Sequence, residues 1–142
     1  MAAELSAPRH TASAMSQENV EIVRRSYDHL SRTGDFLWDL IDPKVEVHDP
    51  PSLPDAEVRH GRDGLRAGLA SVKDSFDEVQ FEVEQIHDFG ENVVVFVRMH
   101  ARGRDSGVEL DVSVAHLITL ENGKLKTIRA MGREEAVEAA GL

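Results

Sequence analysis

The second half of the chain is a series of predicted strands. Apolar and β-branched side chains recur there at the two-residue spacing of β-structure, and short clusters of turn residues interrupt them. Asn122-Gly123 is the strongest hairpin signal, because a two-residue type I′ turn needs positive φ at both positions. The predicted strands are 81–86, 93–102, 108–120 and 125–131. Because turns this short join antiparallel neighbours, this half predicts an antiparallel sheet.

The first half has the wider spacing of helices instead. One apolar stripe is made of Val20, Val23, Tyr27 and Leu30. Ser16 can cap the start of this helix, and Gly34 ends it. Pro43 ends a second, short helix. The predicted helices are 16–33, 35–41, 61–76 and, at the C-terminus, 133–140, with a short strand at 45–49.

Helices that come first and strands that follow are typical of an α+β domain. The predicted architecture is a cone, in which a curved antiparallel sheet carries three N-terminal helices on its concave face. Its interior is either a solid core or a hydrophobic pocket. The 142 residues correspond to one domain, which we place at residues 15–142. Residues 1–14 are rich in Ala, Ser and Pro and are predicted to be a flexible N-terminal extension.

The charge balance excludes several classes of partner. With 26 acidic and 16 basic residues, the formal net charge is −10, which argues against nucleic acid and against a membrane surface. The absence of cysteine rules out disulfides, thiolate catalysis and cysteine-ligated zinc. The seven histidines show no zinc-motif spacing. We therefore expect a cytoplasmic protein that needs no metal and no cofactor.

The strand at 93–102 carries large apolar side chains on both faces. One face is apolar throughout and is expected to lie under the helices: Val93, Val95, Val97, Met99 and Ala101. The other face carries Val94 and Phe96, which a solvent-facing strand would not need. Monomers seldom expose such a patch. We therefore predict a homodimer that buries an outer sheet face made of Phe96, Arg98, His100, Val114, His116 and Ile118.

Several short segments together resemble a known superfamily. They are Leu30-Ser31-Arg32-Thr33-Gly34-Asp35, Val45-Glu46-Val47-His48-Asp49-Pro50, Gly61-Arg62-Asp63-Gly64-Leu65 and Asn122-Gly123-Lys124. Over residues 15–142 the chain resembles the nuclear transport factor two-like superfamily, and more narrowly the bacterial SnoaL-like proteins. The resemblance implies relatives such as ketosteroid isomerase, scytalone dehydratase, limonene epoxide hydrolase and polyketide cyclases. It also implies members that only bind partners, and homodimers among the small bacterial members.

Asp49 is the candidate that this resemblance singles out. It stands at a strand end before proline and so resembles the general base of ketosteroid isomerase. A carboxylate at the edge of an apolar pocket can take a proton from carbon or from water. The alternative is structural, since an aspartate here can also cap the Pro50-Pro51 turn. His48 is a candidate ligand-binding residue, although on a regular strand it faces away from Asp49.

Two more acid–base candidates lie one residue from the positions that the resemblance implies. The second acid of ketosteroid isomerase corresponds to Ala115, next to His116. Its helix-one tyrosine corresponds to Ser26, next to Tyr27. Because a one-residue shift in a strand turns a side chain to the opposite face, His116 is either a catalytic donor or part of the dimer face. Tyr27 is either a catalytic donor or a core residue.

Two hypotheses of different classes follow. The first is a cofactor-independent enzyme that moves a proton on a small, largely apolar molecule, as an isomerase, dehydratase, cyclase or epoxide hydrolase. Asp49 is then the base, with Tyr27 or His116 as the donor, and the pocket is lined by Trp38, His48, Val97, Met99 and Ala115. The second is a non-catalytic dimeric module for a small ligand or a protein. A deep pocket with Asp49 inside favours the first, whereas a filled interior, or Asp49 bonded only to its own turn, favours the second.

Overall fold

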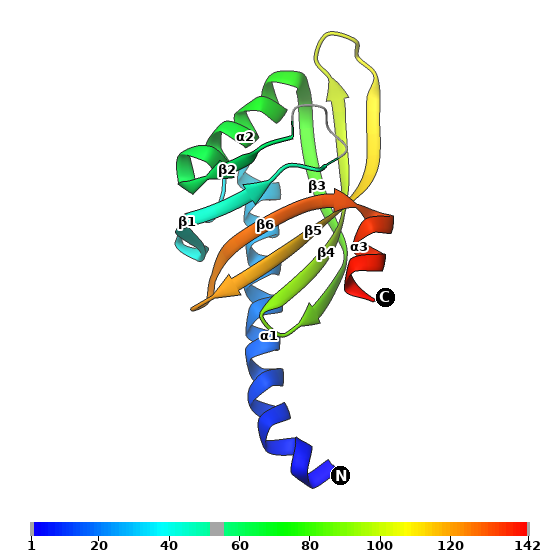
Figure 1. Cartoon of the computed structure of the whole chain (residues 1–142). Helices are drawn as coiled ribbons and strands as arrows, with labels where there is room; N and C mark the ends of the chain where they lie inside the picture. The colour runs from blue at the N-terminus through cyan, green and yellow to red at the C-terminus, as the bar shows by residue number, and fades with distance from the viewer. Residues whose placement is uncertain (1, 52–55, 142) are drawn as a thin grey trace.

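A computed structural model describes residues 2–51 and 56–141, with side chains from residue 17 onward. The helical elements are α1 (Ala2–Thr33), the 3-10 turn η1 (Trp38–Leu40), α2 (Gly61–Ser75) and α3 (Arg133–Ala140). The strands are β1 (Ile41–His48), β2 (Val58–His60), β3 (Phe76–Phe89), β4 (Asn92–Gly103), β5 (Glu109–Glu121) and β6 (Lys124–Gly132). In Figure 1 they form a strongly curved sheet, with α1 and α2 on one side, and the C-terminal helix α3 packs against its other face.

The strands of residues 2–51 and 56–141 form one six-stranded sheet in the order β2-β1-β6-β5-β4-β3. The hairpins β3-β4, β4-β5 and β5-β6 pair antiparallel, as their short turns require. Strand β1 pairs parallel with β6, because the chain leaves β1 through β2 and α2 and reaches the far edge of the sheet before it returns. The sheet is therefore mixed and not purely antiparallel.

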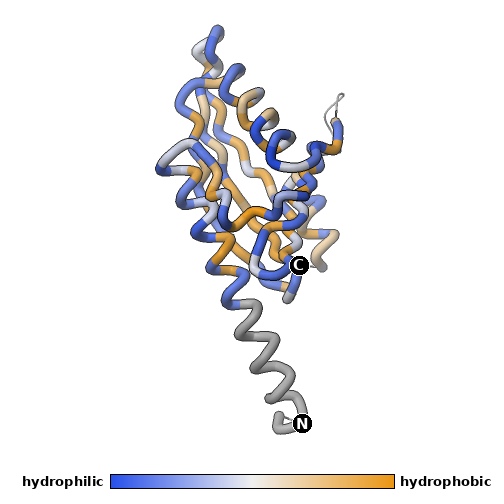
Figure 2. The backbone as a smooth tube through the Cα atoms, turned by 90° about the vertical axis from the view of Figure 1, so that its left-hand side faces the viewer, coloured by the Kyte–Doolittle hydropathy of each residue, from blue (hydrophilic) through white to orange (hydrophobic). Residues whose placement is uncertain are grey.

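The two faces of the sheet are covered by different helices. On the inner face, Val23 and Tyr27 of α1 and Leu65 of α2 pack with inward-facing residues of β1, β4, β5 and β6 in one apolar core. On the outer face, Ala136 of α3 packs against Val94, Phe96 and Ala115 in a smaller cluster. Figure 2, turned by 90°, shows hydrophobic segments along the strands that the helices cover. The expected α+β cone is confirmed, with its main core between α1, α2 and the sheet.

Some elements of the structure differ from those predicted from the sequence. The segment expected to be a second helix is only η1, and β1 begins at Ile41, with Pro43 inside it. The β1–β6 register is irregular between Ile41 and Glu46, so that Pro43, which has no N–H to donate, lies where the ladder is interrupted. Helix α1 begins at Ala2 and not at Ser16. The flexibility proposed for residues 1–14 remains a prediction.

The outer face proposed for a dimer combined residues of two opposite faces. Val95 pairs with His116, and Phe96 pairs with Ala115. Directly paired residues share a face, so His116 lies on the inner face and Phe96 on the outer one. Val114 and Ile118 also pack on the inner core. The prediction that these residues form one surface with Phe96 was wrong, because the strand register had not been established.

Candidate active site

Helix α1 and strand β5 bring together two of the predicted site residues, Tyr27 and His116. The Tyr27 hydroxyl and His116 Nδ1 share a hydrogen bond, although 89 residues separate them in sequence. The two rings are stacked, with centroids 5.9 Å apart and an interplanar angle of 13°. Tyr27 is buried in the inner core, in one apolar cluster with Val23, Val95 and Ile118. The inward orientation of His116 makes it a candidate for chemistry inside the cone and not for a dimer contact.

Burial keeps both members of this pair uncharged at neutral pH. Loss of hydration disfavours the phenolate and raises the pKa of Tyr27 above its usual value. It also disfavours the imidazolium and lowers the pKa of His116 to about 4. A neutral imidazole has one donor and one acceptor nitrogen. When the Tyr27 hydroxyl donates to Nδ1, the ring proton lies on Nε2, which can then donate to another molecule.

Asp49 lies at the loop end of the β1–β2 hairpin. Its backbone N–H donates to the Glu57 carbonyl at 3.1 Å, and the Glu57 N–H donates to Asp49 Oδ2 at 3.3 Å. Its other carboxylate oxygen lies 3.5 Å from Nε of Arg59. Both side chains are about one-fifth exposed, at 19% and 23%. Asp49 is thus held by its own hairpin and by an arginine that the sequence analysis did not single out.

Helix α2 holds Arg59 in place. A Cβ added at Gly64 would lie 3.1 Å from the carbonyl carbon and from Cβ of Arg59, and one at Gly68 would lie 3.4 Å from its Cδ. The two glycines are one helical turn apart and form a flat strip against which β2 and the Arg59 stem pack. This pair of glycines at i and i+4, opposite an arginine, is the signal that could have pointed to Arg59.

The strand register aligns Asp49 with the Tyr27–His116 pair. In the β1–β6 ladder His48 is opposite Arg129, so one further step sets Asp49 opposite Ala130, which in turn pairs with His116. The alternation that points Val47 into the core also points Asp49 to the inner face. Two strand spacings separate the Asp49 and His116 backbones, roughly 10 Å. The side chain between them is only the methyl group of Ala130.

The expected ligand-binding residues do not form one set. Val97 is buried in the inner core, and Met99, two residues on, shares its face. Ala115 is buried on the outer face beneath α3. His48 points away from Asp49, as expected, and its Nε2 lies 3.3 Å from a carboxylate oxygen of Glu46. Trp38 packs at the rim of the inner core.

Trp38 is surrounded by aromatic and cationic groups. Its ring meets Phe36 edge to face, with centroids 5.3 Å apart. The guanidinium of Arg66 lies 4.5 Å from the ring centre, and that of Arg62 lies 5.9 Å away. Arg62 also donates to the backbone carbonyls of Trp38 and Ile41. These contacts anchor η1 to α2, and they make the single tryptophan of the chain a reporter of changes at the rim of the core.

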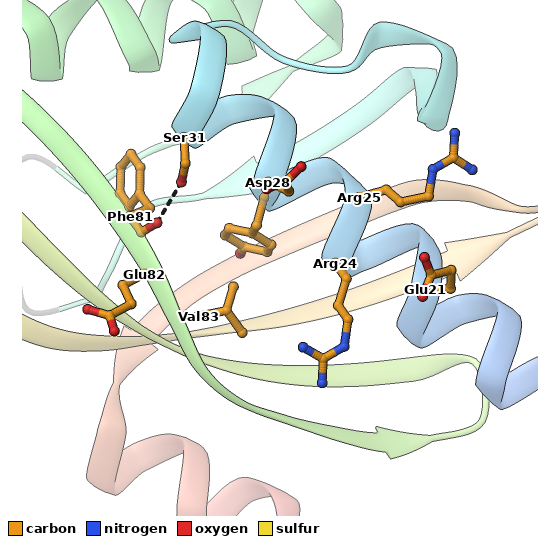
Figure 3. A pocket seen from close by; sticks show the side chains of 9 residues that line it. Glu21, Arg24, Arg25, Asp28, Ser31, Phe81, Glu82 and Val83 are labelled. Atoms are coloured by element: carbon orange, nitrogen blue, oxygen red, sulfur yellow. Dashed lines mark hydrogen bonds between the residues drawn. The ribbon is translucent and has the colours of Figure 1, made fainter.

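A groove of about 560 Å³ runs between α1 and the edge strand β3 (Figure 3). Two hydrogen bonds fix its ends: Ser31 Oγ donates to the Phe81 carbonyl at 2.6 Å, and Asn19 Nδ2 donates to the Gly90 carbonyl at 3.0 Å. Tyr27 is the predicted catalytic residue that lines it. A smaller hollow of about 240 Å³ lies on the outer face beside α3, next to Val94, Leu117 and Met131.

Among the described side chains, those of residues 17–51 and 56–141, no group of three or more histidine, aspartate or glutamate residues is arranged to hold a metal ion. In residues 2–51 and 56–141, no helix is both long enough and apolar enough to cross a membrane.

Comparison with known proteins decides the family. The model of the SnoaL-like domain matches residues 23–128. The chain belongs to the SnoaL-like family. No curated protein matches it significantly. The resemblance to the nuclear transport factor two-like superfamily and its SnoaL-like members is thereby confirmed.

Solved structures share the fold of this SnoaL-like chain. A putative SnoaL-like polyketide cyclase from Jannaschia sp. CCS1 is 23% identical, with a TM-score of 0.71 over 89% of this chain and 92% of that one. An NTF2-like protein from Burkholderia pseudomallei K96243 is 21% identical, with a TM-score of 0.72 over 85% and 95%. TerC, co-crystallised with polyporic acid, is 20% identical, with a TM-score of 0.72 over 86% and 96%. At these identities the likeness establishes the fold and not the reaction.

Proposed function

We propose that this SnoaL-like protein is a cofactor-independent enzyme that binds a small, largely apolar molecule and moves a proton on it. The observation that carries the proposal is the hydrogen-bonded pair of the buried Tyr27 and the partly buried His116, both uncharged at neutral pH. Burying a polar group in an apolar core costs free energy unless the group is hydrogen-bonded. Such a group is useful in an enzyme, because a donor in apolar surroundings strongly stabilises negative charge that develops on a substrate. The SnoaL-like family includes polyketide cyclases, which fits this class of reaction.

In the proposed reaction each polar residue has a separate task. His116 Nε2–H, with Nδ1 held by Tyr27, donates a hydrogen bond to a carbonyl oxygen and stabilises the enolate that forms. Asp49, in line with His116 across Ala130, takes the proton from the adjacent carbon and returns it at another position. Arg59 is a positioning residue, because it pairs with the Asp49 carboxylate but lies outside the row that contains His116.

Hydrogen–deuterium exchange at carbon tests the proposal without a known substrate. A panel of small cyclic ketones is incubated with the protein in D₂O, and α-deuteration is followed by proton NMR. We expect catalysed exchange for some members and a loss of about 10²–10⁴ in its rate in His116→Asn. His100→Asn is the matched control, since His100 lies on the outer face beside Glu82 and Asp111. Exchange that is unchanged in His116→Asn contradicts the assignment.

A non-catalytic binding module is the second candidate, and the surroundings of Asp49 favour it. The carboxylate is already bonded to Glu57 and paired with Arg59. Much of the inner face is filled by packed apolar side chains. If ligands quench or shift Trp38 fluorescence while no ketone exchanges protons, this candidate replaces the enzyme.

We also propose that the protein forms a homodimer through the outer sheet face. The corrected surface combines a network of Arg98, Glu84, Asp111 and His100 with the apolar hollow beside α3. Such a mixed surface resembles a protein interface more than the side of a monomer. Light scattering should find twice the chain mass of 15.7 kDa, and a single-chain particle at micromolar concentration would refute the dimer.

A further inference from the structure

The groove between α1 and β3 has an apolar floor and charged walls. Its floor is formed by Tyr27 of α1 and by Phe81 and Val83 of β3, which are only partly buried although they pack on the core. Its walls carry the exposed side chains of Glu21, Arg24, Arg25 and Asp28. A volume of about 560 Å³ is in the range of small-molecule sites, roughly 300–1,000 Å³.

Helical geometry separates the two arginines of the groove. Ser31 bonds to Phe81, so the stripe of α1 that contains Ser31 faces β3. Arg24 is seven residues, or about two turns, before Ser31 and lies on the same stripe, whereas Arg25 is rotated by roughly 100°. Figure 3 agrees, with Arg24 on the strand side of α1 and Arg25 on the other side. Arg24 is thus the cation that faces the apolar floor.

Two of the acidic residues of the groove contact partners other than Arg24. The Asp28 carboxylate lies 2.9 Å from Nε of Arg32, and the Glu82 carboxylate lies 3.4 Å from His100 on the outer face. Within the described part of the chain, Arg24 forms no ion pair, and Glu21 is the one acidic side chain of the groove that is not engaged elsewhere. The groove of this acidic chain, whose net charge is −10, thus carries a cationic side chain, Arg24, beside its apolar floor.

We propose that the groove binds an apolar organic carboxylate, with Arg24 holding the carboxylate and Phe81 and Val83 contacting the apolar body. A guanidinium matches a carboxylate in charge and in geometry. This inference rests on the proposed function and deepens it. The link is Tyr27, which lines the groove and is hydrogen-bonded to His116. The inference assigns to the groove a ligand of the class of aromatic or alicyclic acids.

Calorimetric titration with 2-naphthoate and with the neutral 2-naphthamide tests this assignment. We expect the carboxylate to bind more tightly, and Arg24→Gln to weaken its binding by about three- to tenfold while leaving the amide unchanged. Arg25→Gln is the comparison variant: it removes the same charge from a residue that also lines the groove but projects from the other side of α1, so it should weaken naphthoate binding less than Arg24→Gln does. Both substitutions are at exposed helix positions, so folding should be preserved.

Each outcome decides one of the two proposals. Equal binding of acid and amide, equal effects of Arg24→Gln and Arg25→Gln, or no binding of naphthoate at millimolar concentration refutes the carboxylate site. Arg24-dependent binding in a protein that exchanges no ketone protons refutes the proposed reaction but supports the site. Exchange that depends on His116, without a preference for the carboxylate, supports the reaction and refutes the site. His116→Asn should leave the Arg24-dependent binding intact, because the groove residues do not include His116.

Discussion

Acidification should destabilise this protein through His116 in a calculable way. The imidazole binds its proton near pH 6.5 in the unfolded chain and near pH 4 in the folded chain, because burial beside Tyr27 disfavours the charged ring. Between these values the unfolded state holds more protons than the folded state. The stabilising effect of the neutral ring is therefore fully present above about pH 6.5 and is lost as the pH falls through this interval.

The size of the effect follows from the two pKa values. For one site with pKa 6.5 unfolded and about 4 folded, the free energy of unfolding falls by roughly 2 kcal/mol between pH 7 and pH 5. Carboxylates and the other histidines add their own pH dependence, so the measured quantity is the difference between two proteins. Urea unfolding at several pH values, for the natural protein and for His116→Asn, should show a shallower decline in the variant.

His116→Asn keeps a hydrogen-bond acceptor near the Tyr27 hydroxyl and removes the titration. Should this variant be too unstable, the proton NMR shift of the His116 ring in the natural protein measures the same pKa directly. Equal pH dependence in the two proteins, or a ring that titrates above pH 6, would refute the reasoning. Either result would mean that water or a polar group solvates the ring in the folded protein.

Four further substitutions have defined outcomes. Tyr27→Phe should lower the free energy of unfolding in urea by about 1–3 kcal/mol, because it leaves the buried Nδ1 of His116 without its partner; an unchanged value would mean that the hydrogen bond adds nothing. Gly64→Ala should destabilise by about 1 kcal/mol, since its Cβ meets the backbone beneath α2, whereas Gly68→Ala should stabilise by up to about 1 kcal/mol, since a flexible side chain can move aside. The same sign for both alanines in thermal unfolding would contradict this packing. Asp49→Asn should change stability by less than about 1 kcal/mol but reduce ketone exchange by about 10²–10⁴, and exchange at the natural rate would exclude Asp49 as the base.

Local sequence patterns were sufficient to predict most of the elements. The strands of the second half, the Asn122-Gly123 turn and the helix at Arg133–Ala140 occur where their spacing places them, because hairpins and short helices depend on nearby residues. The stretch around Pro43 was misjudged, because a proline that ends a helix and a proline at an interrupted strand ladder look alike in sequence. The parallel pairing of β1 with β6 depends on how distant segments assemble, which periodicity does not record.

The candidate site was harder to predict, because it depends on register. Whether His116 faces inward is decided by its pairing with Val95 and Ala130, and an error of one residue reverses the answer. Tyr27 could be placed on the buried stripe of α1 from sequence, but its partner could not be identified. Arg59 lies ten positions after Asp49 and reaches it only because β1 and β2 form a hairpin.

The Tyr27–His116 pair separates the two functional candidates on physical grounds. A binding module has no need for a buried titratable pair on its inner face, since the hydrogen bond of Tyr27 with His116 contributes less to stability than apolar packing of equal volume would. An enzyme has a use for it, because a neutral donor in an apolar surrounding stabilises a developing enolate more strongly than the same donor in water. The Asp49–Arg59 pair favours the binding module, since the carboxylate already has a partner, and the Asp49 and His116 backbones are two strand spacings, roughly 10 Å, apart. It follows that replacing Tyr27 and His116 together by Phe and Leu should raise the stability of a binding module and leave its ligand affinity intact, whereas in an enzyme the same exchange should raise stability and abolish proton exchange.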